Sequence, residues 1–395
     1  MSAHVLLKPT GARCNLDCAY CYFLRKEDLY PRSSFRMDDE VLAAALRGII
    51  DATDGEVVTI AWQGGEPTLM GVDFFRRADS LARRLLPAGK RIEYTIQTNG
   101  TRLDDELCAC FAELGYLVGI SIDGPRDLHD AFRVDPSGRG TFDRVVAGLD
   151  RLKVHGVEWN VLTSVHAANG DHGAEVYRFL RDELDARYVQ LIPVVERVGP
   201  DGRTGEQVGD TVTERSVRPE QWGRFLSAVF DEWLVRDVGE VFVVNFDWSL
   251  AAWVGLESPV CIFRPTCGDA LALEHNGDLY SCDHFVEPAF RLGNVTEQPL
   301  RVLAASERQR EFGAAKAAKL PEQCRSCDFR FACHGECPKN RFTVTATGEE
   351  NLNYLCAGYL EYFRRADPVL REMAALVSRG LPAAFAAGPR GPSAT

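Results

Sequence analysis

Apolar, β-branched segments recur along the first half of the chain, and most are followed by a stretch with helical periodicity. The predicted strands span residues 4–9, 57–62, 92–99, 117–123, 157–163 and 188–195. The intervening helices are expected at residues 38–50, 72–86, 104–114, 142–155 and 174–184. In the third helix Leu103, Leu107, Phe111 and Leu114 share one face. Acidic residues from Asp104 onward suit the N-terminus of that helix.

Strands that alternate with helices predict a parallel sheet with right-handed crossovers. Strands that are apolar nearly throughout are typical of a sheet buried on both faces. Six such units, rather than eight, predict an α/β fold of the partial (β/α)6 type, which resembles an incomplete TIM barrel. In barrels of this kind the chemistry lies at the C-terminal ends of the strands.

The pattern changes after the sixth strand. Residues 196–218 are polar and Gly-rich and predict a loop, and a helix is expected at about 220–235. A cysteine-rich stretch with short elements follows, and residues 381–395 are rich in Ala, Gly, Pro and Ser, which predicts disorder. We therefore divide the chain into a barrel domain at 1–235, a cysteine-rich domain at 236–364, and a C-terminal helix with a disordered tail at 365–395.

Composition narrows the possible partners. The chain is 46% hydrophobic and 26% charged, as in soluble globular proteins, and its net charge of −12 argues against binding to nucleic acid or to an anionic membrane surface. No apolar run approaches the roughly 18 residues of a membrane span, and the N-terminus has no signal-peptide pattern. We expect a cytoplasmic protein that acts as a monomer.

Thirteen cysteines in a reducing compartment indicate metal ligands rather than disulfides. Cys14, Cys18 and Cys21 lie in one short loop after the first strand. Three thiolates can hold three irons of a [4Fe–4S] cluster and leave the fourth iron open for chemistry. The alternatives are a zinc site that lacks a ligand and ordinary buried thiols. No histidine completes a zinc set nearby, since the next one after His4 is His129.

Eight more cysteines in the second half can form two sets of four thiolates. They are Cys261, Cys267, Cys282, Cys324, Cys327, Cys333, Cys337 and Cys356. Zinc remains an alternative here, because Cys-x2-Cys pairs occur in both kinds of site; the corresponding non-enzyme hypothesis is a zinc-stabilised binding module. Cys108 and Cys110 stand two apart on a predicted helix and do not share a face, so we interpret them as ordinary residues.

Polar or glycine-rich segments follow several predicted strands. Gln63-Gly64-Gly65-Glu66-Pro67 follows the second strand, and its two glycines allow close approach of the backbone to a ligand. Strand ends also carry Gln97-Thr98-Asn99-Gly100 and Ser121-Ile122-Asp123-Gly124-Pro125. Ordinary turn chemistry is the alternative for each. Arg133 could bind a carboxylate through paired N–H groups or be a solvated surface residue.

The three-cysteine loop, the aromatic Tyr22 after it and the Gly-Gly-Glu-Pro segment together resemble the radical S-adenosylmethionine (SAM) enzymes, whose open iron chelates SAM. The eight later cysteines resemble the SPASM domain of that superfamily, which holds two auxiliary [4Fe–4S] clusters. The resemblance therefore implies SAM and three [4Fe–4S] clusters as cofactors. It also implies interleaved ligand sets, namely Cys261, Cys267, Cys282 and Cys337 for one cluster and Cys324, Cys327, Cys333 and Cys356 for the other.

From Lys8 to about Arg364 the chain is most similar to the anaerobic sulfatase-maturating enzymes. Further segments that carry this resemblance are Lys8-Pro9-Thr10-Gly11, Gln190-Leu191-Ile192-Pro193, Gly277–Asp283 and Leu352–Cys356. The family oxidises one Cys or Ser of a sulfatase Cys/Ser-x-Pro-x-Arg segment to Cα-formylglycine, using a 5′-deoxyadenosyl radical that removes a Cβ hydrogen. The implied partners are an unfolded sulfatase segment and an external electron donor such as flavodoxin or ferredoxin.

The resemblance also implies roles for individual residues. Asp283 matches the catalytic base, which takes a proton from the substrate thiol or hydroxyl. SAM contacts are implied at Tyr20, Gly64, Gly65, Glu66, Ser121, Arg133 and Val195, and peptide contacts at Gln63 and Phe23. Phe23 stands where some members have Tyr. The competing hypothesis is a radical SAM/SPASM maturase that forms a thioether or carbon crosslink in a ribosomally made peptide.

Overall fold

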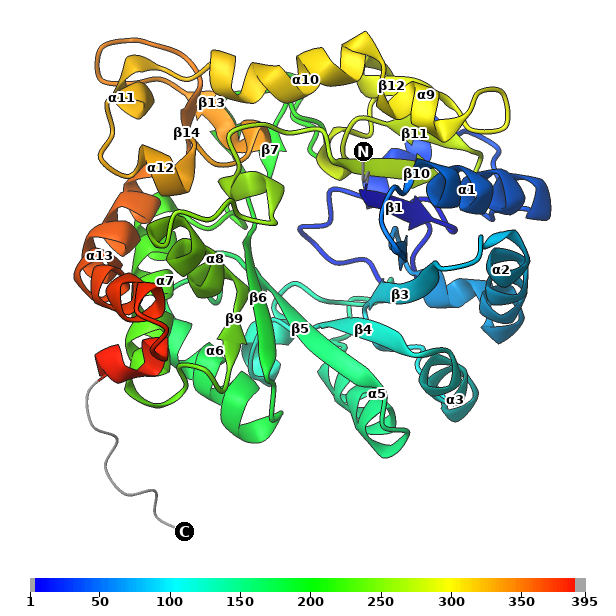
Figure 1. The fold of residues 1–395 in the computed structure, drawn as a ribbon, viewed down its shortest axis with the longest axis horizontal. Helices are drawn as coiled ribbons and strands as arrows, with labels where there is room; N and C mark the ends of the chain where they lie inside the picture. Colours follow the sequence, from blue (N-terminus) through cyan, green and yellow to red (C-terminus); the bar gives the residue numbers. More distant parts are fainter. Residues whose placement is uncertain (1–3, 388–395) are drawn as a thin grey trace.

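In the computed structural model, which describes residues 4–387, one continuous sheet has the strand order β12-β11-β10-β1-β2-β3-β4-β5-β6-β9. The six predicted strands form its parallel centre and curve into an open barrel (Figure 1). The strands of this sheet are β1 His4–Lys8, β2 Val57–Trp62, β3 Arg91–Thr98, β4 Tyr116–Ser121, β5 Glu158–Val165, β6 Tyr188–Pro193, β9 Phe242–Val243, β10 Ala270–Glu274, β11 Asp278–Tyr280 and β12 Arg291–Asn294.

The helices predicted between the strands are present. They are α1 Asp39–Ala52, α2 Val72–Leu85, α3 Asp105–Leu114, α5 Phe142–Val154, and α6 Gly173–Arg178 continued by the π-helical turn η3 Phe179–Glu183. Asp104 is the N-cap of α3, since its carboxylate accepts a hydrogen bond from the Leu107 backbone N–H at 2.9 Å. The five-residue helix α4 Arg126–Asp130 was not predicted, because so short a segment shows no periodicity.

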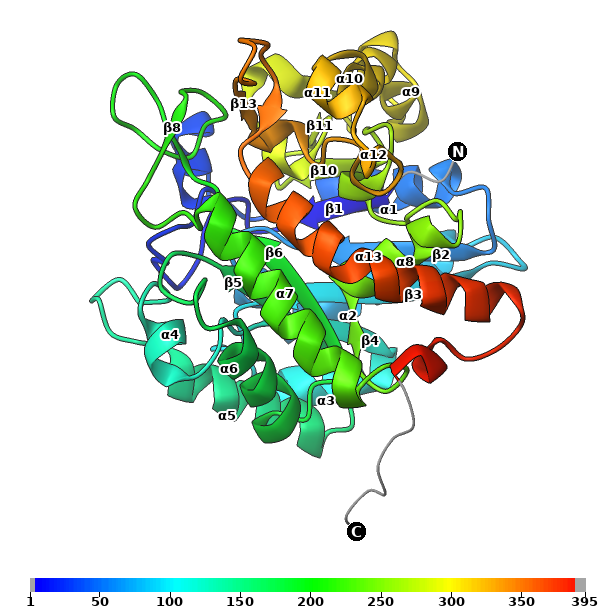
Figure 2. The same cartoon turned by 90° about the vertical axis from the view of Figure 1, so that its left-hand side faces the viewer.

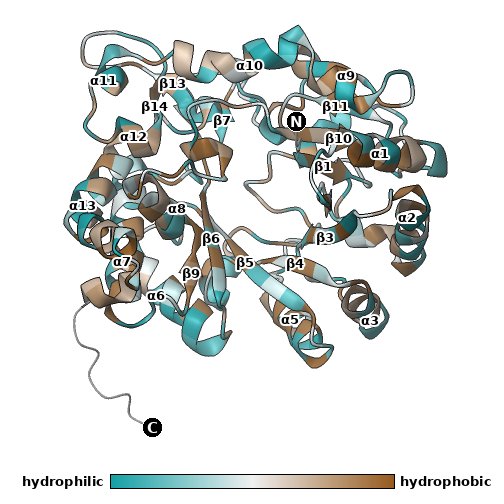
Figure 3. Ribbon diagram, viewed as in Figure 1, coloured by the Kyte–Doolittle hydropathy of each residue, from teal (hydrophilic) through white to brown (hydrophobic). Residues whose placement is uncertain are grey.

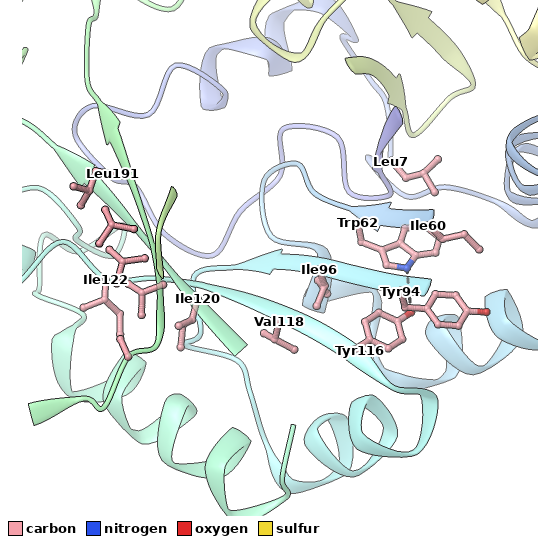
Figure 4. Packing of buried hydrophobic residues seen from close by; sticks show 14 of the residues in the cluster. Leu7, Ile60, Trp62, Tyr94, Ile96, Tyr116, Val118, Ile120, Ile122 and Leu191 are labelled. Atoms are coloured by element: carbon pink, nitrogen blue, oxygen red, sulfur yellow. Dashed lines mark hydrogen bonds between the residues drawn. The ribbon is translucent and has the colours of Figure 1, made fainter. Parts of the chain in front are cut away.

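The barrel strands are apolar because both of their faces are covered. Ile60, Trp62 and Val118 are fully buried, and Figure 4 shows side chains of neighbouring strands packed together. The indole N–H of Trp62 donates to the Tyr116 hydroxyl at 3.0 Å, so this buried polar atom has a partner. In Figure 3, β6 is largely hydrophobic, whereas α2 mixes hydrophilic and hydrophobic residues, as expected of a helix with one face on the sheet.

The cysteine-rich region shares this sheet. β10 pairs parallel with β1, and β11 and β12 extend the edge as antiparallel strands. The remaining α-helices are α7 Pro219–Arg236, α8 Val244–Trp253, α9 Leu300–Ala304, α10 Glu307–Ala318, α11 Glu322–Arg325, α12 Arg330–Cys333 and α13 Cys356–Ser378. Short 3-10 turns are η1 Leu24–Leu29, η2 Pro67–Met70, η4 Cys261–Phe263, η5 Asp283–Phe285, η6 Pro288–Phe290, η7 Pro338–Asn340 and η8 Ala383–Ala387, and a small separate sheet pairs β13 Arg341–Thr343 with β14 Leu352–Asn353.

Two parts of the second half differ from the sequence prediction. The segment 196–218 is not wholly a loop, since β7 Arg197–Val198 and β8 Thr211–Val212 pair as a short hairpin. The C-terminal helix α13 begins at Cys356 rather than at 365, because its buried face, including Tyr359, Phe363 and Leu370, continues across that position. α13 lies along α7 (Figure 2).

The predicted disordered tail also differs in part. Residues 383–387 form η8, which packs against α13, and residues 388–395 lie outside the described residues. Among residues 4–387, no helix combines the length and the apolar character needed to cross a bilayer.

Candidate active site

The cysteine loop after β1 is tied to the end of β2 by backbone hydrogen bonds. The Gly65 N–H donates to the Gly11 carbonyl at 2.8 Å, and the Glu66 N–H donates to the Arg13 carbonyl at 3.0 Å. A Cβ at Gly65 would lie 2.1 Å from the Arg13 oxygen, so only glycine allows this approach. The carbonyls of Gly64 and Gly65 accept no hydrogen bond from a described residue. They are suitable acceptors for an ammonium group.

Cys14, Cys18 and Cys21 gather in this loop as partly buried free thiols. Burial raises the pKa of Cys14 to about 12, and the neighbouring Cys18 and Cys21 charges add to the shift. The same cause raises the pKa of Cys18 to about 12. Three thiols this close are costly to ionise together without a cation, so binding of a metal cluster would be coupled to their deprotonation.

The eight later cysteines form two groups in space. In the first group, burial and then the charges of Cys337 and Cys261 raise the pKa of Cys282. Burial also raises the pKa of Cys337, and the charge of Cys267 raises it further. In the other group, burial and then neighbouring charges raise the pKa of Cys333 to about 12 and that of Cys356 to about 11. These couplings join Cys333 to Cys356 and Cys324, and Cys356 to Cys324 and Cys327.

The second group lines a cavity. Cys324, Cys327, Cys333 and Cys356 face it together with apolar residues that include Phe329, Tyr359 and Phe363. A thiol-lined, largely apolar cavity fits a four-thiolate iron–sulfur cluster. The two spatial groups are the interleaved sets that the resemblance implies; ligation by them stays a prediction.

A buried carboxylate, Asp123, organises the ends of β4 and β5. It accepts hydrogen bonds from the Tyr20 hydroxyl at 2.5 Å and from Arg133 Nε at 2.8 Å. Burial alone would raise the pKa of Asp123, but the charges of Arg133 and His166 outweigh it and hold this pKa well below its usual range. Arg133 is 7% exposed and stays cationic. Its guanidinium therefore has a fixed orientation, which suits binding of a carboxylate.

Two other residues predicted to contact the cofactor have protein partners. Ser121 Oγ accepts a hydrogen bond from Gln97 Nε2 at 3.0 Å. Glu66 is fully buried, and its carboxylate accepts from the hydroxyls of Thr68 at 2.6 Å and Thr98 at 2.8 Å and from the Asn99 N–H at 2.8 Å. The Glu66 side chain therefore joins the ends of β2 and β3, and a cofactor contact at this position would use the backbone.

Asp283 lies where the cysteine-rich region meets the barrel. Its carboxylate forms an ion pair with the Lys8 ammonium and accepts a hydrogen bond from the Tyr22 hydroxyl at 2.9 Å. Burial raises the pKa of Asp283, but the Lys8 charge, which is the largest opposing cause, and these hydrogen bonds outweigh it and lower this pKa to about 2. Asp283 is therefore ionised at neutral pH, as a proton acceptor must be, and its low pKa makes it a weak base while the Lys8 ion pair is intact.

Sequence reasoning assigned no role to Lys8 or Tyr22, although both lie in segments that carry the family resemblance. Phe23 is 4% exposed, and its ring centre lies 3.8 Å from the Lys8 ammonium. The hydroxyl that Phe23 lacks is supplied beside Asp283 by Tyr22. The Gln63 backbone N–H donates to the Leu7 carbonyl at 2.7 Å. Peptide contacts by Gln63 and Phe23 stay predictions.

A pocket of about 140 Å³ lies between the barrel and the cysteine-rich region. Tyr20 and Val195 line it on the barrel side, and Tyr22 and His284 line it on the side of Asp283. The loop of the β7–β8 hairpin covers part of it, since the Gln207 backbone N–H donates to Glu287 Oε1 at 3.1 Å. Tyr20 and Val195 are thus the predicted cofactor contacts that line the pocket, and Asp283 lies behind its wall, hydrogen-bonded to the lining residue Tyr22.

Comparison with family models gives two matches. Residues 9–180 match the radical SAM superfamily, and residues 261–328 match an iron–sulfur cluster-binding domain, SPASM. A serine-type anaerobic sulfatase-maturating enzyme of Bacteroides thetaiotaomicron is 44% identical over 93% of this chain and 90% of its own length. A cysteine-type enzyme of Clostridium perfringens is 31% identical over 94% of this chain and 98% of its own length.

A solved structure is similar over nearly the whole chain. It is described as native anSMEcpe with bound AdoMet and Cp18Cys peptide, and it has a TM-score of 0.84 at 29% identity over 95% of this chain and 99% of that chain. These matches confirm the predicted fold class, with a radical SAM barrel and a C-terminal SPASM domain, and a radical SAM oxidoreductase with SAM and iron–sulfur cofactors. The chain belongs to the anaerobic sulfatase-maturating enzymes of the radical SAM superfamily.

Proposed function

We propose that this protein oxidises one Ser or Cys of a sulfatase Ser/Cys-x-Pro-x-Arg segment to Cα-formylglycine. The observation that carries the proposal is Asp283, an ionised carboxylate held by Lys8 and Tyr22 beside a four-cysteine group and next to the pocket. A zinc-stabilised binding module would need neither such a base nor the glycine-lined approach at Gly65.

Three [4Fe–4S] clusters fit the three groups of cysteines. Cys14, Cys18 and Cys21 would hold the first and leave one iron for SAM. The other two would be held by Cys261, Cys267, Cys282 and Cys337 and by Cys324, Cys327, Cys333 and Cys356. The first cluster and SAM, when bound and reduced, would supply a carbon radical derived from SAM that removes a hydrogen atom from the peptide Cβ, and the two later clusters would offer a route for the remaining electron.

The protein's own residues bind and orient the reactants. The carbonyls of Gly64 and Gly65 would accept hydrogen bonds from the SAM amino group, and Arg133 would pair with its carboxylate. Tyr20, Ser121 and Val195 would complete the cofactor side of the pocket. Gln63 and Phe23 would lie toward the peptide.

Asp283 would take the proton of the substrate hydroxyl or thiol. Serine then loses two hydrogen atoms in all, one from Cβ and one from oxygen as a proton and an electron, and the product is the aldehyde. Cysteine gives a thioaldehyde by the same steps, and water replaces the sulfur, which leaves as hydrogen sulfide. The Tyr22 hydroxyl and the Lys8 ammonium keep the Asp283 carboxylate charged and oriented for this role.

The partners follow from this chemistry. The substrate would be an unfolded sulfatase segment, because an extended peptide can reach the pocket, and the reducing electron would come from an external donor such as flavodoxin or ferredoxin. Thirteen free cysteines suit a reducing compartment, so we place the protein in the cytoplasm. We further propose that it acts as a monomer.

Anaerobic incubation of the reconstituted protein with SAM, a reductant and peptides that differ only in Ser or Cys tests the proposal. Whichever peptide reacts, the product is the same formylglycine aldehyde. Mass spectrometry should detect this aldehyde after it has been trapped as a hydrazone. The greater identity with the serine-type relative, 44% against 31%, favours the Ser peptide as the better substrate. A thioether or carbon crosslink in place of the aldehyde would support the competing maturase hypothesis.

A further inference from the structure

The cysteine loop is held from two sides at the surface. The Asp17 and Ala19 backbone N–H groups donate to the carbonyls of Val134 and Phe132, each at 2.9 Å. On the other side, Asn15 Nδ2 donates to Thr101 Oγ1 at 2.8 Å. A groove of about 550 Å³ lies between these supports, and it is lined by Asn15, Thr101, Arg102, Asp135, Pro136, Ser137, Arg139 and Arg144.

This groove is basic although the chain carries a net charge of −12. Arg102, Arg139 and Arg144 are exposed. Asp135 is the single carboxylate among the lining residues; it is buried, and it pairs with Arg139 at 3.2 Å and with Arg144 at 3.1 Å. The lining therefore has a formal charge of +2. A positive groove on an acidic protein attracts an acidic partner at long range.

A short bonded path joins the groove to the first cysteine. Asn99 Nδ2 contacts Cys14 Sγ at 3.6 Å and donates to Asn15 Oδ1 at 3.0 Å, and Asn15 in turn bonds Thr101 in the wall of the groove. A molecule seated in the groove would thus lie within three hydrogen-bonded side chains of the N-terminal cluster. Among the hydrogen bonds of the described residues, no comparable path leads from this groove to the eight later cysteines.

We propose that this groove docks an acidic one-electron carrier protein that reduces the N-terminal cluster. The inference rests on the proposed function, since it assumes a cluster at Cys14, Cys18 and Cys21. We propose a protein rather than a small anion as the occupant. Asp135 already neutralises Arg139 and Arg144 in part. The remaining positive charge is therefore spread over the groove and does not form a single strong anion site. The rival docking face is the surface at Arg325 and Arg330 beside the last four-cysteine group, where Arg325 pairs with Glu322 at 2.9 Å.

The test measures the rate of cluster reduction by stopped-flow absorbance in the reconstituted full chain. Flavodoxin hydroquinone is the acidic protein donor, and photoreduced deazariboflavin is a small uncharged donor. The charge reversals Arg102→Glu/Arg139→Glu should lower the second-order rate with flavodoxin by about tenfold or more at low ionic strength and flatten its salt dependence. The rate with deazariboflavin should not change.

Arg102→Glu alone leaves the Asp135 ion pairs intact and should lower the flavodoxin rate by a smaller factor. This single variant replaces the double variant if the latter does not fold. Arg325→Glu is the matched single-charge control and should leave the flavodoxin rate near that of the wild type. Three outcomes would overturn the docking site. They are an unchanged rate of reduction by flavodoxin in the groove variants, a lower rate in the control variant alone, and an equal decrease in rate with both donors. Absence of aldehyde product in the wild type with both donors, while cluster reduction stays fast, would refute the proposed function instead.

Discussion

Lys8, the last residue of β1, forms an ion pair with Asp283, which lies 275 positions later in the chain. The ammonium is also over the Phe23 ring and is only 2% exposed. Parallel pairing of β1 with β10 puts the cysteine-rich region beside the barrel, and Asp283 stands in the 3-10 turn η5 that follows β11. The pair therefore joins the barrel to the cysteine-rich region at the candidate base.

Asp283→Asn removes the proposed proton acceptor and keeps the shape of the side chain. We expect SAM cleavage and iron content near those of the wild type, but aldehyde formation lower by at least about 100-fold, the usual contribution of a general base. Parallel assays of 5′-deoxyadenosine and of modified peptide separate the two steps. Asp237→Asn is the control, because that carboxylate bonds Tyr177 and Arg181 on the outer helices. Full peptide modification by Asp283→Asn would remove this residue from the mechanism.

Tyr22→Phe removes one of the two donors to Asp283. We expect peptide modification to fall by about tenfold, with unchanged SAM cleavage, since one lost hydrogen bond to a charged group is worth roughly 1.5 kcal/mol. The exchange variant Tyr22→Phe/Phe23→Tyr keeps one hydroxyl but places it at the buried ring that packs against Lys8. This variant should not recover activity. Recovery would show that either position can supply the hydroxyl.

The grouping of the cysteines predicts a pattern of iron loss. Cys337→Ala and Cys333→Ala should each remove one cluster's iron and sulfide from the reconstituted protein. Cys261→Ala/Cys337→Ala should lose no more than Cys337→Ala, whereas Cys333→Ala/Cys337→Ala should lose two clusters. Cys14→Ala should abolish SAM cleavage, and Cys108→Ala is the control, since Cys108 is buried in the hydrophobic core. Equal iron loss from the two double variants would contradict the assignment of these cysteines to two separate clusters.

Asp247 in α8 predicts a dependence of stability on pH. Burial raises the pKa of its carboxyl to about 6, above the roughly 3.9 of an unfolded aspartate. Its ionisation therefore costs stability as pH rises from about 4 to 6, and the cost stays constant at higher pH. Asp247→Asn should raise the free energy of unfolding by about 2 kcal/mol at pH 7.5, after allowance for partial exposure. Denaturant unfolding should show this gap closing as pH falls; a constant gap would contradict the shift.

Local patterns predicted much of the fold. Apolar runs located all six barrel strands, and periodicity located α1, α2, α3 and α5, because the side chains of a strand or helix repeat with a fixed period whatever the partner. Spacing alone also identified the three-cysteine loop. The five-residue helix α4 and the β7–β8 hairpin were missed, since each is too short to show a period.

The sequence by itself thus determined the order of the elements, the cysteines available as ligands and, through the resemblance, the family. Only the tertiary structure decided that β10 joins β1 and that the Tyr22 hydroxyl and the Lys8 ammonium reach Asp283. These relationships depend on contacts between residues far apart in the chain. Such contacts are set by how the sheet and its loops pack together, and they leave no periodic trace in the local sequence.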